Sequence, residues 1–573
     1  MIKKRRIVIG IVVSVGLVVA GWAAWVRTTR PTTNVLFITL DTTRADRLGC
    51  YGYPEAQTPT LDRLASEGVL FERACSPAPL TLPVHASLFT GLYPAEHGLR
   101  TNGRGSLDRS IPTLATDLAA AGYDTAAFVA SFVLNRKFGL NRGFAVYDDD
   151  LSSADPAEDA LHRQRDGSQV VDRALAWLKQ PRNKPFLCWV HLYDPHFPYL
   201  LHEAEFGDRF AGRPYDAEIA YVDQQVQRLL TELDQQGATN QTLVVVVGDH
   251  GEGLGQHVEK THGYTLYEAT QHVPLMMRLP GQTVPGHRAT APVPLVDVHP
   301  TLVELLNIKS RGKANGRSLA GAVKGQAIDG RKCLASTDDP FLQNGWSPLA
   351  SLVQGDWKYI RTTKPELFDL SNDPGEIHNL VATEPAKLAQ MQQSLDQFQQ
   401  ALVATQAAAV QLSPAERRAL ASLGYLGGGT KAADAETAGP LPDVKDMLPF
   451  DVAAQEAVDR LHAGQIQPAI EQLRRIVADS TTHVASRLFL GEALQHEQQF
   501  DAAIACYEEI LRLKPDHLGA LIHLGLARLT QDRLDDALAR FDEALAVDPD
   551  SGEAHYNRGL VLVQLGRLDE AID

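Results

Sequence analysis

Short, continuously apolar runs alternate with amphipathic stretches from Asn34 to about Asp373. The apolar runs are rich in Val, Ile and Leu and include Val35–Leu40, Phe186–Val190 and Leu243–Val247. The stretches Thr58–Glu67 and Tyr221–Gln235 have helical character. Uninterrupted Val/Ile/Leu runs are typical of strands that are covered on both faces. The pattern predicts an α/β fold with helices on either side of a sheet, whose ligand site lies at the carboxyl ends of the strands.

A second pattern, with a period of 34 residues, runs from about Asp451 to Asp573. Small, aromatic and proline positions recur at this interval, at Gly491, Gly525 and Gly559, at Ala469, Ala503, Ala537 and Ala571, at Tyr507 and Phe541, and at Pro515 and Pro549. Small residues at fixed positions let paired helices pack closely. The period resembles tetratricopeptide repeats, which implies an all-α solenoid that binds a protein or peptide partner. Repeats that only dock on the preceding domain are the alternative.

Two segments join these regions and complete the predicted domain organisation. Residues Glu384–Val410 are rich in Gln, Ala and Leu and predict a helical extension, and the small, polar residues 427–442 predict a linker. We therefore divide the chain into an N-terminal segment (1–30), a catalytic domain (31–383), a helical extension with linker (384–450) and repeats (451–573).

The N-terminal segment has the pattern of a membrane anchor. Four basic residues, Lys3 to Arg6, precede an uncharged and mainly apolar run from Ile7 to Val26. Twenty helical residues span the hydrocarbon layer of about 30 Å, whereas the apolar core of a cleaved signal peptide has about 7–15 residues. We expect a transmembrane helix in the inner membrane, with both later domains on the extracytoplasmic, periplasmic side. A cleaved signal peptide and a buried core helix are the alternatives.

Composition excludes several classes of protein. The net charge of −16 and the absence of a basic, aromatic stripe argue against a nucleic-acid partner. The 44 Gly and 32 Pro among 573 residues exclude a collagen-like or wholly disordered chain. Five scattered cysteines form no CxxC pair, so they indicate neither a thiolate zinc site nor a disulfide framework.

Ligand-type side chains follow three of the predicted strands. Asp41 ends the first, and the adjacent Asp249 and His250 end the strand that runs into GDHGEGLGQH. A carboxylate and an imidazole suit Zn²⁺ or Mn²⁺ better than Mg²⁺ or Ca²⁺. The third strand leads to His191, Asp194 and His196, and His262 follows within THGY. Strand ends that converge on one rim predict a metal site, although each residue alone could be a turn former or a core residue.

Thr81 is the candidate nucleophile. It lies in APLTLPVHASLFTG, where Pro83 has the fixed φ of a first helical turn. Thr81 would then sit at the helix N-terminus, where free N–H groups and the dipole favour an anion. A hydroxyl that faces a divalent cation there would attack a phosphoryl or sulfuryl centre. The alternative is a simple N-cap threonine.

These motifs resemble the sulfatase branch of the alkaline phosphatase superfamily. The resemblance covers Asn34 to about Asn379 through NVLFITLDTTRAD, TxPxHxSLFTG, HGLRTNG, YDPHFPY, GDHGEGLGQH, HGYTLYEATQHVPL, LVDVHPTL and LFDLSNDPGEIHNL. It implies that Asp41, Thr81, Asp249 and His250 hold a divalent ion, with Zn, Mn and Ca all open. It implies that His196 and His262 are catalytic and hold the substrate's anionic oxygens or a second ion, and that Asn102 contacts a non-bridging oxygen. His257 matches less well, and His85, His191, Asp194 and Lys260 are weaker candidates.

The nucleophile position departs from the sulfatase pattern. Sulfatases oxidise a Cys or Ser there to formylglycine, which Thr81 cannot become, and His85 stands where the family has arginine. A shifted reading onto Cys75 fails because Pro79 would then occupy the arginine position. Threonine nucleophiles occur in other branches of the superfamily, which implies a phosphothreonine intermediate. The functions that follow are a sulfate or phosphate ester hydrolase, a phosphoethanolamine or phosphoglycerol transferase acting on envelope lipid or glycan, or an inactive scaffold that binds partners through its repeats.

Overall fold

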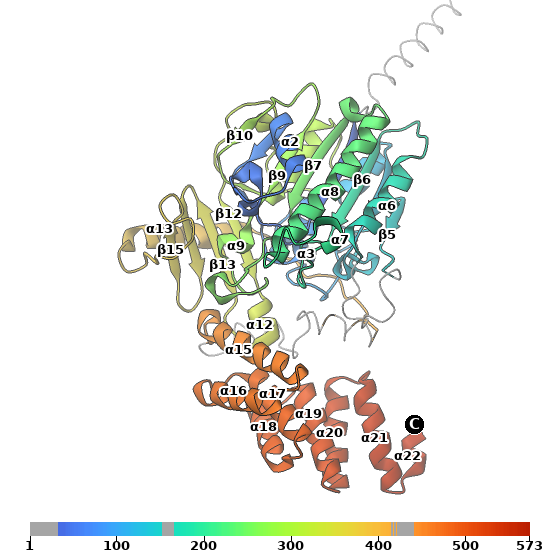
Figure 1. Ribbon diagram of the computed structural model, residues 1–573, viewed down its shortest axis with the longest axis vertical. Coiled ribbons are helices and arrows are strands. Elements are labelled where there is room, and N and C mark those ends of the chain that lie inside the picture. Colours follow the sequence, from blue (N-terminus) through green and yellow to red (C-terminus); the bar gives the residue numbers. More distant parts are fainter. Residues whose placement is uncertain (1–32, 152–164, 414–415, 417–419, 421–440, 573) are drawn as a thin grey trace, which may run out of the picture.

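The computed structural model describes residues 33–151, 165–413, 416, 420 and 441–572. Figure 1 shows an α/β body above an array of paired helices. The predicted membrane anchor lies outside the described residues. Within the described part of the chain, no helix combines the length and apolar character that a membrane crossing needs.

An eight-stranded sheet forms the centre of the α/β body, in the order β10-β2-β9-β7-β1-β6-β4-β5. Its strands are β1 (Asn34–Leu40), β2 (Val69–Phe71), β4 (Asp124–Phe128), β5 (Val146–Asp148), β6 (Phe186–Leu192), β7 (Thr242–Gly248), β9 (Leu275–Arg278) and β10 (His287–Ala289). β1 is central and pairs in parallel with β6 and β7. The three apolar runs of the sequence are these three strands, which confirms the predicted α/β fold.

Both faces of this sheet are covered by helices. Val35 and Phe37 of β1 join a core with α3 (Thr81–Thr90), α5 (Leu114–Ala120) and α10 (Val298–Leu305). Leu36 and Ile38 join a core on the other face with α2 (Pro59–Glu67), α6 (Gly167–Leu178) and α8 (Pro214–Gln235). Successive strand residues point to opposite faces, so a continuous apolar run serves both cores.

Two smaller sheets and several short helices complete the body. β3 (Ala74–Cys75), β8 (His272–Val273) and β11 (Val293–Pro294) form one sheet, and β12 (Cys333–Thr337), β13 (Leu349–Gln354), β14 (Trp357–Arg361) and β15 (Glu366–Asp369) form the other. The short helices are α4 (Pro94–His97), α7 (Glu203–Phe206), α9 (Glu268–Gln271), α11 (Ala320–Val323) and α12 (Asp339–Asn344).

The helical extension is shorter than the sequence predicts. α13 spans Pro385–Ala401 and packs Met391 and Leu395 against Leu352 and Tyr359 of the four-stranded sheet. The chain then leaves the helix, and Ala408 forms a β-bridge with Ser106. The predicted end at Val410 was wrong because this segment pairs with the α/β body instead of continuing the helix.

The helical array confirms the repeat prediction. It contains α15 (Val444–His462), α16 (Ile466–Asp479), α17 (Val484–His496), α18 (Phe500–Leu513), α19 (Leu518–Thr530), α20 (Leu534–Val547), α21 (Gly552–Gln564) and α22 (Leu568–Ile572). A Cβ on Gly491 would lie 2.5 Å from the ring of Tyr507, and one on Gly525 would lie 2.7 Å from the ring of Phe541. The repeating glycines therefore make room for the repeating aromatic rings.

The first helices of the array contact the α/β body. Nζ of Lys260 lies 3.0 Å from Oε1 of Glu456 on α15. The rings of Trp346 and His483 stack with centroids 5.9 Å apart. Figure 1 shows α15 beside α12 at this junction. The repeats thus dock on the body through their N-terminal end.

Candidate active site

Sheet register brings the predicted ligands together. Thr39 of β1 is opposite His191 of β6, and Leu40 is opposite Gly248 of β7. The backbone N–H of Asp41 donates to the carbonyl of Leu192 at 3.0 Å, and that of Asp249 donates to the carbonyl of Leu40 at 3.2 Å. Because the three strands are parallel neighbours, their carboxyl ends place His191, Asp41 and the Asp249–His250 pair at one edge of the sheet.

Asp41, Asp249 and His250 form a buried group with the composition of a metal site. One ligand atom from each lies within 4.8 Å of the others. Nε2 of His250 is 3.6 Å from Oδ1 of Asp41 and 3.7 Å from Oδ2 of Asp249. Among the described residues, neither of these carboxylate oxygens has a hydrogen-bond partner. Unpartnered, buried oxygens of two acids fit a divalent cation, since buried charges are otherwise paired.

The electrostatics of this group support the same interpretation. Burial, together with the charges of Asp249 and Glu252, raises the pKa of Asp41 well above its usual value. Burial likewise raises the pKa of Asp249. Burial lowers the pKa of His250, so its imidazole is neutral, the form that binds a metal ion. His191 borders this group, with Nε2 3.5 Å from Oδ2 of Asp41.

Thr81 lies against this cluster. It is the first residue of α3, as the position of Pro83 predicts, and its side chain is buried. Its Oγ1 is 3.3 Å from Nε2 of His250 and 3.5 Å from Oδ2 of Asp41. One expectation needs correction, because the Leu82 N–H at this helix end is not free. It donates to Oδ1 of Asn102 at 2.9 Å.

Asn102 and His85 flank Thr81 from different sides. With Oδ1 held by Leu82, Asn102 keeps a buried Nδ2 that has no acceptor among the described residues. His85 instead has both ring nitrogens engaged, Nδ1 with the Thr81 carbonyl at 2.8 Å and Nε2 with Oγ1 of Thr39 at 3.0 Å. Asn102 can therefore donate to a ligand. His85 supports the Thr81 backbone, and its substrate contact stays a prediction.

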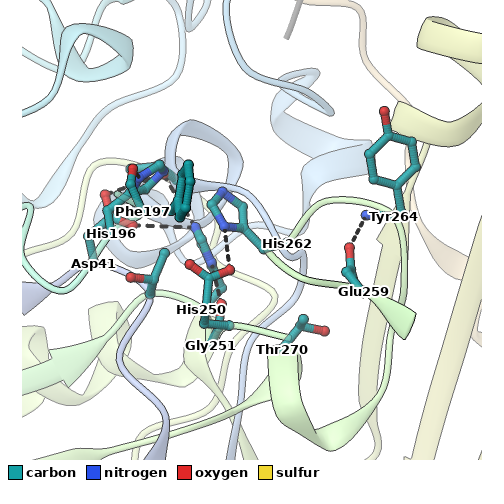
Figure 2. A network of polar contacts seen from close by, with 12 residues as sticks. Asp41, His196, Phe197, His250, Gly251, Glu259, His262, Tyr264 and Thr270 are labelled. Carbon is teal, nitrogen blue, oxygen red and sulfur yellow. Dashed lines mark hydrogen bonds and ion pairs between the residues drawn. The ribbon is translucent and has the colours of Figure 1, made fainter. Parts of the chain in front are cut away.

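His196 and His262 lie beside His250, as Figure 2 shows. The ring centroid of His262 is 4.5 Å from that of His250 and 5.0 Å from that of His196. Nδ1 of His196 contacts the Phe197 carbonyl at 2.7 Å, and its buried Nε2 has no partner among the described residues. Burial lowers the pKa of both His196 and His262 to about 4. The structure thus brings together every residue predicted as a metal ligand or catalytic group.

Glu252 is a site residue that the sequence reasoning missed. It is fully buried, and its Oε1 lies 3.1 Å from Nδ1 of His262. Its backbone carbonyl accepts from Nη1 of the buried Arg44 at 3.1 Å. The signal was present, because an acidic residue between two glycines directly after Asp249 and His250 has no role in a hydrophobic core.

Three weaker candidates lie elsewhere. The exposed Lys260 is ion-paired with Glu456, so a substrate contact stays a prediction without geometric support. His257 stacks on Tyr267 at 3.6 Å and bonds the Gly375 carbonyl. Asp194 belongs to a separate group with His202 and Glu218.

Family models match both parts of the chain. A model described as sulfatase matches residues 33–308, and one described as N-sulphoglucosamine sulphohydrolase, C-terminal, matches residues 261–404. Two models described as tetratricopeptide repeat match residues 484–517 and 522–573.

Relatives of known sequence carry sulfatase names. The uncharacterized sulfatase YidJ of Escherichia coli (strain K12) is 28% identical over 422 residues, which is 61% of this chain and 83% of that protein. The Delta 4,5-hexuronate-2-O-sulfatase of Bacteroides thetaiotaomicron is 25% identical over 420 residues, which is 61% of this chain and 84% of that protein.

Solved structures share the fold of the α/β body. One, in complex with its substrate D-glucosamine-2-N,6-O-disulfate, has a TM-score of 0.57 at 19% identity and covers 65% of this chain and 98% of its own. The phosphonate monoester hydrolase of Agrobacterium radiobacter has a TM-score of 0.54 at 22% identity and covers 64% of this chain and 95% of its own.

Proposed function

This chain carries a sulfatase-family domain followed by tetratricopeptide repeats, and we propose that it hydrolyses a sulfate, phosphate or phosphonate ester with Thr81 as nucleophile. The observation that carries the proposal is the position of the Thr81 hydroxyl, 3.3 Å from His250 and 3.5 Å from Asp41. A threonine that only capped α3 would need neither neighbour, and the N-cap residue of α3 is Leu80 and not Thr81.

Asp41, Asp249 and His250, with Thr81, are the residues that would hold a divalent cation, and their donor set favours Zn²⁺ or Mn²⁺. When bound, such an ion supplies positive charge that makes a hydroxyl more acidic and offsets the charge of the transferring group. Backbone bonds orient the unpartnered oxygen of Asp249, and the Thr81 hydroxyl contacts the other oxygen of Asp41. For Asp249, the N–H groups of Thr42 and His250 both donate to Oδ1.

Other side chains are placed to bind the oxyanion. Nδ2 of Asn102 is a buried donor next to the start of α3, where the helix dipole favours negative charge. His196 presents Nε2 from the loop between β6 and α7. Because its Nδ1 donates to the Phe197 carbonyl, Nε2 becomes a donor when the charge of a bound anion favours its protonation. These groups would hold the non-bridging oxygens while Thr81 approaches the sulfur or phosphorus atom.

The proposed reaction has two steps. In the first, Oγ1 of Thr81 gives its proton to Oδ2 of Asp41 and bonds to the sulfur or phosphorus atom, and the ester bond breaks. The leaving oxygen takes the proton of Nε2 of His262, while Glu252, whose pKa burial raises to about 8, gives its own proton to Nδ1 of the same ring. In the second, water attacks the same atom and gives a proton to Nε2 of His262, which returns its Nδ1 proton to Glu252, and Oγ1 of Thr81 leaves with the proton held on Asp41. The carbon that bears the nucleophilic oxygen of threonine carries no second hydroxyl. Threonine therefore cannot expel sulfate as a hydrated aldehyde does. Attack by water on the covalent intermediate is therefore obligatory, which favours phosphoryl or phosphonyl substrates.

The location and the partner extend this proposal. We place the active site on the extracytoplasmic side because the basic cluster Lys3 to Arg6 precedes the apolar run Ile7–Val26. A protein partner would bind the repeats.

The test compares Thr81→Val, which removes only the hydroxyl, with Thr81→Ser, which keeps it. We expect Thr81→Val to lose at least about 10³-fold in turnover of aryl phosphate, phosphonate and sulfate probes, and Thr81→Ser to retain activity. Rapid acid quench should trap the covalent intermediate, which mass spectrometry detects as a mass increase of the peptide that contains Thr81. Incorporation of ¹⁸O from water into the released anion identifies hydrolysis, whereas transfer to an added alcohol would identify a transferase. Full activity of Thr81→Val would refute the proposal.

A further inference from the structure

A second group of side chains with metal-ligating atoms lies between α8 and the loop that carries His196. Asp194 follows β6, His202 precedes α7, and Glu218 lies on α8. One ligand atom from each lies within 4.8 Å of the others. Among the residues that the structure describes, no Lys or Arg forms an ion pair with Asp194 or Glu218. The group therefore consists of two carboxyl groups and one imidazole.

The internal bonds of this group leave one carboxylate oxygen unsatisfied. Nε2 of His202 is 2.8 Å from Oε2 of Glu218, whose Oε1 accepts from the Leu200 N–H at 2.7 Å. The side chains of His202 and Glu218 are 7% and 3% exposed. Oδ2 of Asp194 is buried and has no hydrogen-bond partner in the described part of the chain. A buried, unpartnered carboxylate oxygen beside a second acid calls for a positive charge.

The surroundings of Asp194 disfavour a bare carboxylate, so the ionised form needs a cation beside it. Burial raises the pKa of Asp194 to about 8, and the charges of Glu218 and Asp166 contribute. Asp166 lies at the start of α6, where its Oδ1 accepts from the hydroxyl of Tyr221 on α8 at 2.7 Å. Three carboxyl groups from separate parts of the chain thus share one region, and His202 is a basic group whose charge acts on Asp194.

We propose that Asp194, His202 and Glu218 bind a divalent cation that is separate from the ion at Asp41, Asp249 and His250. Two carboxylate oxygens and an imidazole nitrogen match the ligand preferences of Zn²⁺ and Mn²⁺. Ligand bonds of about 2.0–2.2 Å require only a small contraction of the present group. On binding, Nε2 of His202 gives up its contact with Glu218 and directs its lone pair to the ion.

The position of this site assigns it a structural role. Asp194 lies two residues before His196, and His202 lies six residues after it. An ion held by these residues and by Glu218 would fasten both ends of the loop to α8. His196, which stacks on Tyr193 with ring centroids 4.3 Å apart, would then keep its place beside His262. The three ligands would thus position a residue of the active site without touching the substrate.

The test counts bound zinc in the purified full-length protein after chelation and reloading with Zn²⁺. We expect Asp194→Asn to hold one equivalent fewer than the unsubstituted protein, and the double variant Asp194→Asn/Asp249→Asn to hold one fewer than Asp249→Asn. His202→Asn should repeat the effect of Asp194→Asn. Glu205→Gln, which removes an exposed acid near His202, serves as the matched control and should lose none.

A second measurement covers variants that fold poorly. Zn²⁺ at 100 times its dissociation constant should raise the melting temperature of Asp249→Asn, because binding to the folded state stabilises it by about 2.7 kcal/mol. The double variant should show no rise. This proposal would be overturned if Asp249→Asn and the double variant bound equal amounts of zinc, or if zinc raised their melting temperatures equally. Either result leaves the Thr81 proposal intact, because that proposal depends on Asp41, Asp249 and His250.

Discussion

Oε1 of Glu252 lies 3.1 Å from Nδ1 of His262, ten residues further along the chain. The loop between them folds back on itself, because the Gly253 N–H donates to the Thr261 carbonyl at 2.6 Å and the Leu254 N–H donates to the Lys260 carbonyl at 3.0 Å. Glu259, in the same loop, accepts a hydrogen bond from the Tyr264 N–H, as Figure 2 shows. This arrangement brings His262 to His250 and pairs it with a carboxyl group whose pKa burial raises to about 8, so that Glu252 can hold the proton that His262 passes on.

His262 should act as the general acid, so its removal should matter most for poor leaving groups. We expect His262→Gln to reduce kcat/KM by about 10²–10⁴-fold for alkyl esters and by much less for 4-nitrophenyl esters, which need no protonation. Glu252→Gln should show the same trend more weakly, because Glu252 acts only through His262. The measurement is kcat/KM for a series of esters whose leaving groups differ in pKa. His196→Gln is the comparison, and an equal steepening there would assign the acid to His196.

Removal of one carboxylate charge should abolish cation binding at Asp41, Asp249 and His250. In Asp249→Asn the amide oxygen can still accept from the Thr42 and His250 N–H groups, while the unpartnered Oδ2 is lost. We expect no thermal stabilisation by Zn²⁺ or Mn²⁺, measured with Asp194→Asn also present so that only this site counts. Without metal, Asp249→Asn should melt higher than its parent, since a like-charge contact with Asp41 is gone. A lower melting temperature would contradict this account.

Gly491 should tolerate no side chain. A Cβ there would lie 2.5 Å from Tyr507, and overpacking of this kind costs about 1–3 kcal/mol. Gly491→Ala should therefore lower the melting temperature of the repeats while ester hydrolysis is retained. Gly552→Ala is the control, because no atom lies within 4 Å of the added Cβ. It should be neutral or stabilising by about 0.5 kcal/mol. Equal melting temperatures for the two variants would refute the packing argument.

Lys260 should contribute to the junction with the repeats and not to substrate binding. Its side chain and that of Glu456 are 53% and 49% exposed, so their ion pair is worth at most about 1 kcal/mol. We expect Lys260→Ala and Glu456→Gln to leave KM within about twofold, an effect below 0.5 kcal/mol. Steady-state kinetics of both variants provide the check. A rise in KM for Lys260→Ala alone would restore the substrate contact that the sequence predicts.

Acid should destabilise the α/β body through His97. Its Nδ1 accepts from the Leu99 N–H at 3.2 Å and its Nε2 meets Oγ of Ser87 at 3.1 Å. Burial lowers its pKa from 6.5 to about 3. The unfolded chain therefore takes up a proton first, so stability is complete above about pH 6.5 and falls as the pH drops toward 3. Between pH 7 and pH 5 the loss from this one residue is about 2 kcal/mol.

Urea unfolding at pH 7, 6 and 5 measures this slope. His97→Asn keeps an oxygen acceptor for Leu99 and cannot titrate, so its slope should be smaller. His378→Asn, at a side chain that is 78% exposed, is the control and should change nothing. An unchanged slope in His97→Asn would exclude His97 as the titrating group.

Local patterns along the chain were enough to predict much of this protein. The Val/Ile/Leu runs identified β1, β6 and β7, since only strands buried on both faces are apolar throughout. The recurring Gly491 and Gly525 identified the repeats. Pro83 located the start of α3 and so the position of Thr81. Each of these depends on near neighbours in sequence, where backbone preference and side-chain size act directly.

Contacts between distant segments needed the tertiary structure. The pairing of Glu252 with His262, the engagement of both nitrogens of His85, and the ion pair of Lys260 with α15 each depend on how loops return to the sheet. The same holds for the group of Asp194, His202 and Glu218, which only the packing of α8 against the loop after β6 brings together. Sequence determined which residues can do chemistry. The long-range packing decided which of them face one another, because burial and distance set the charge and the partners of each group.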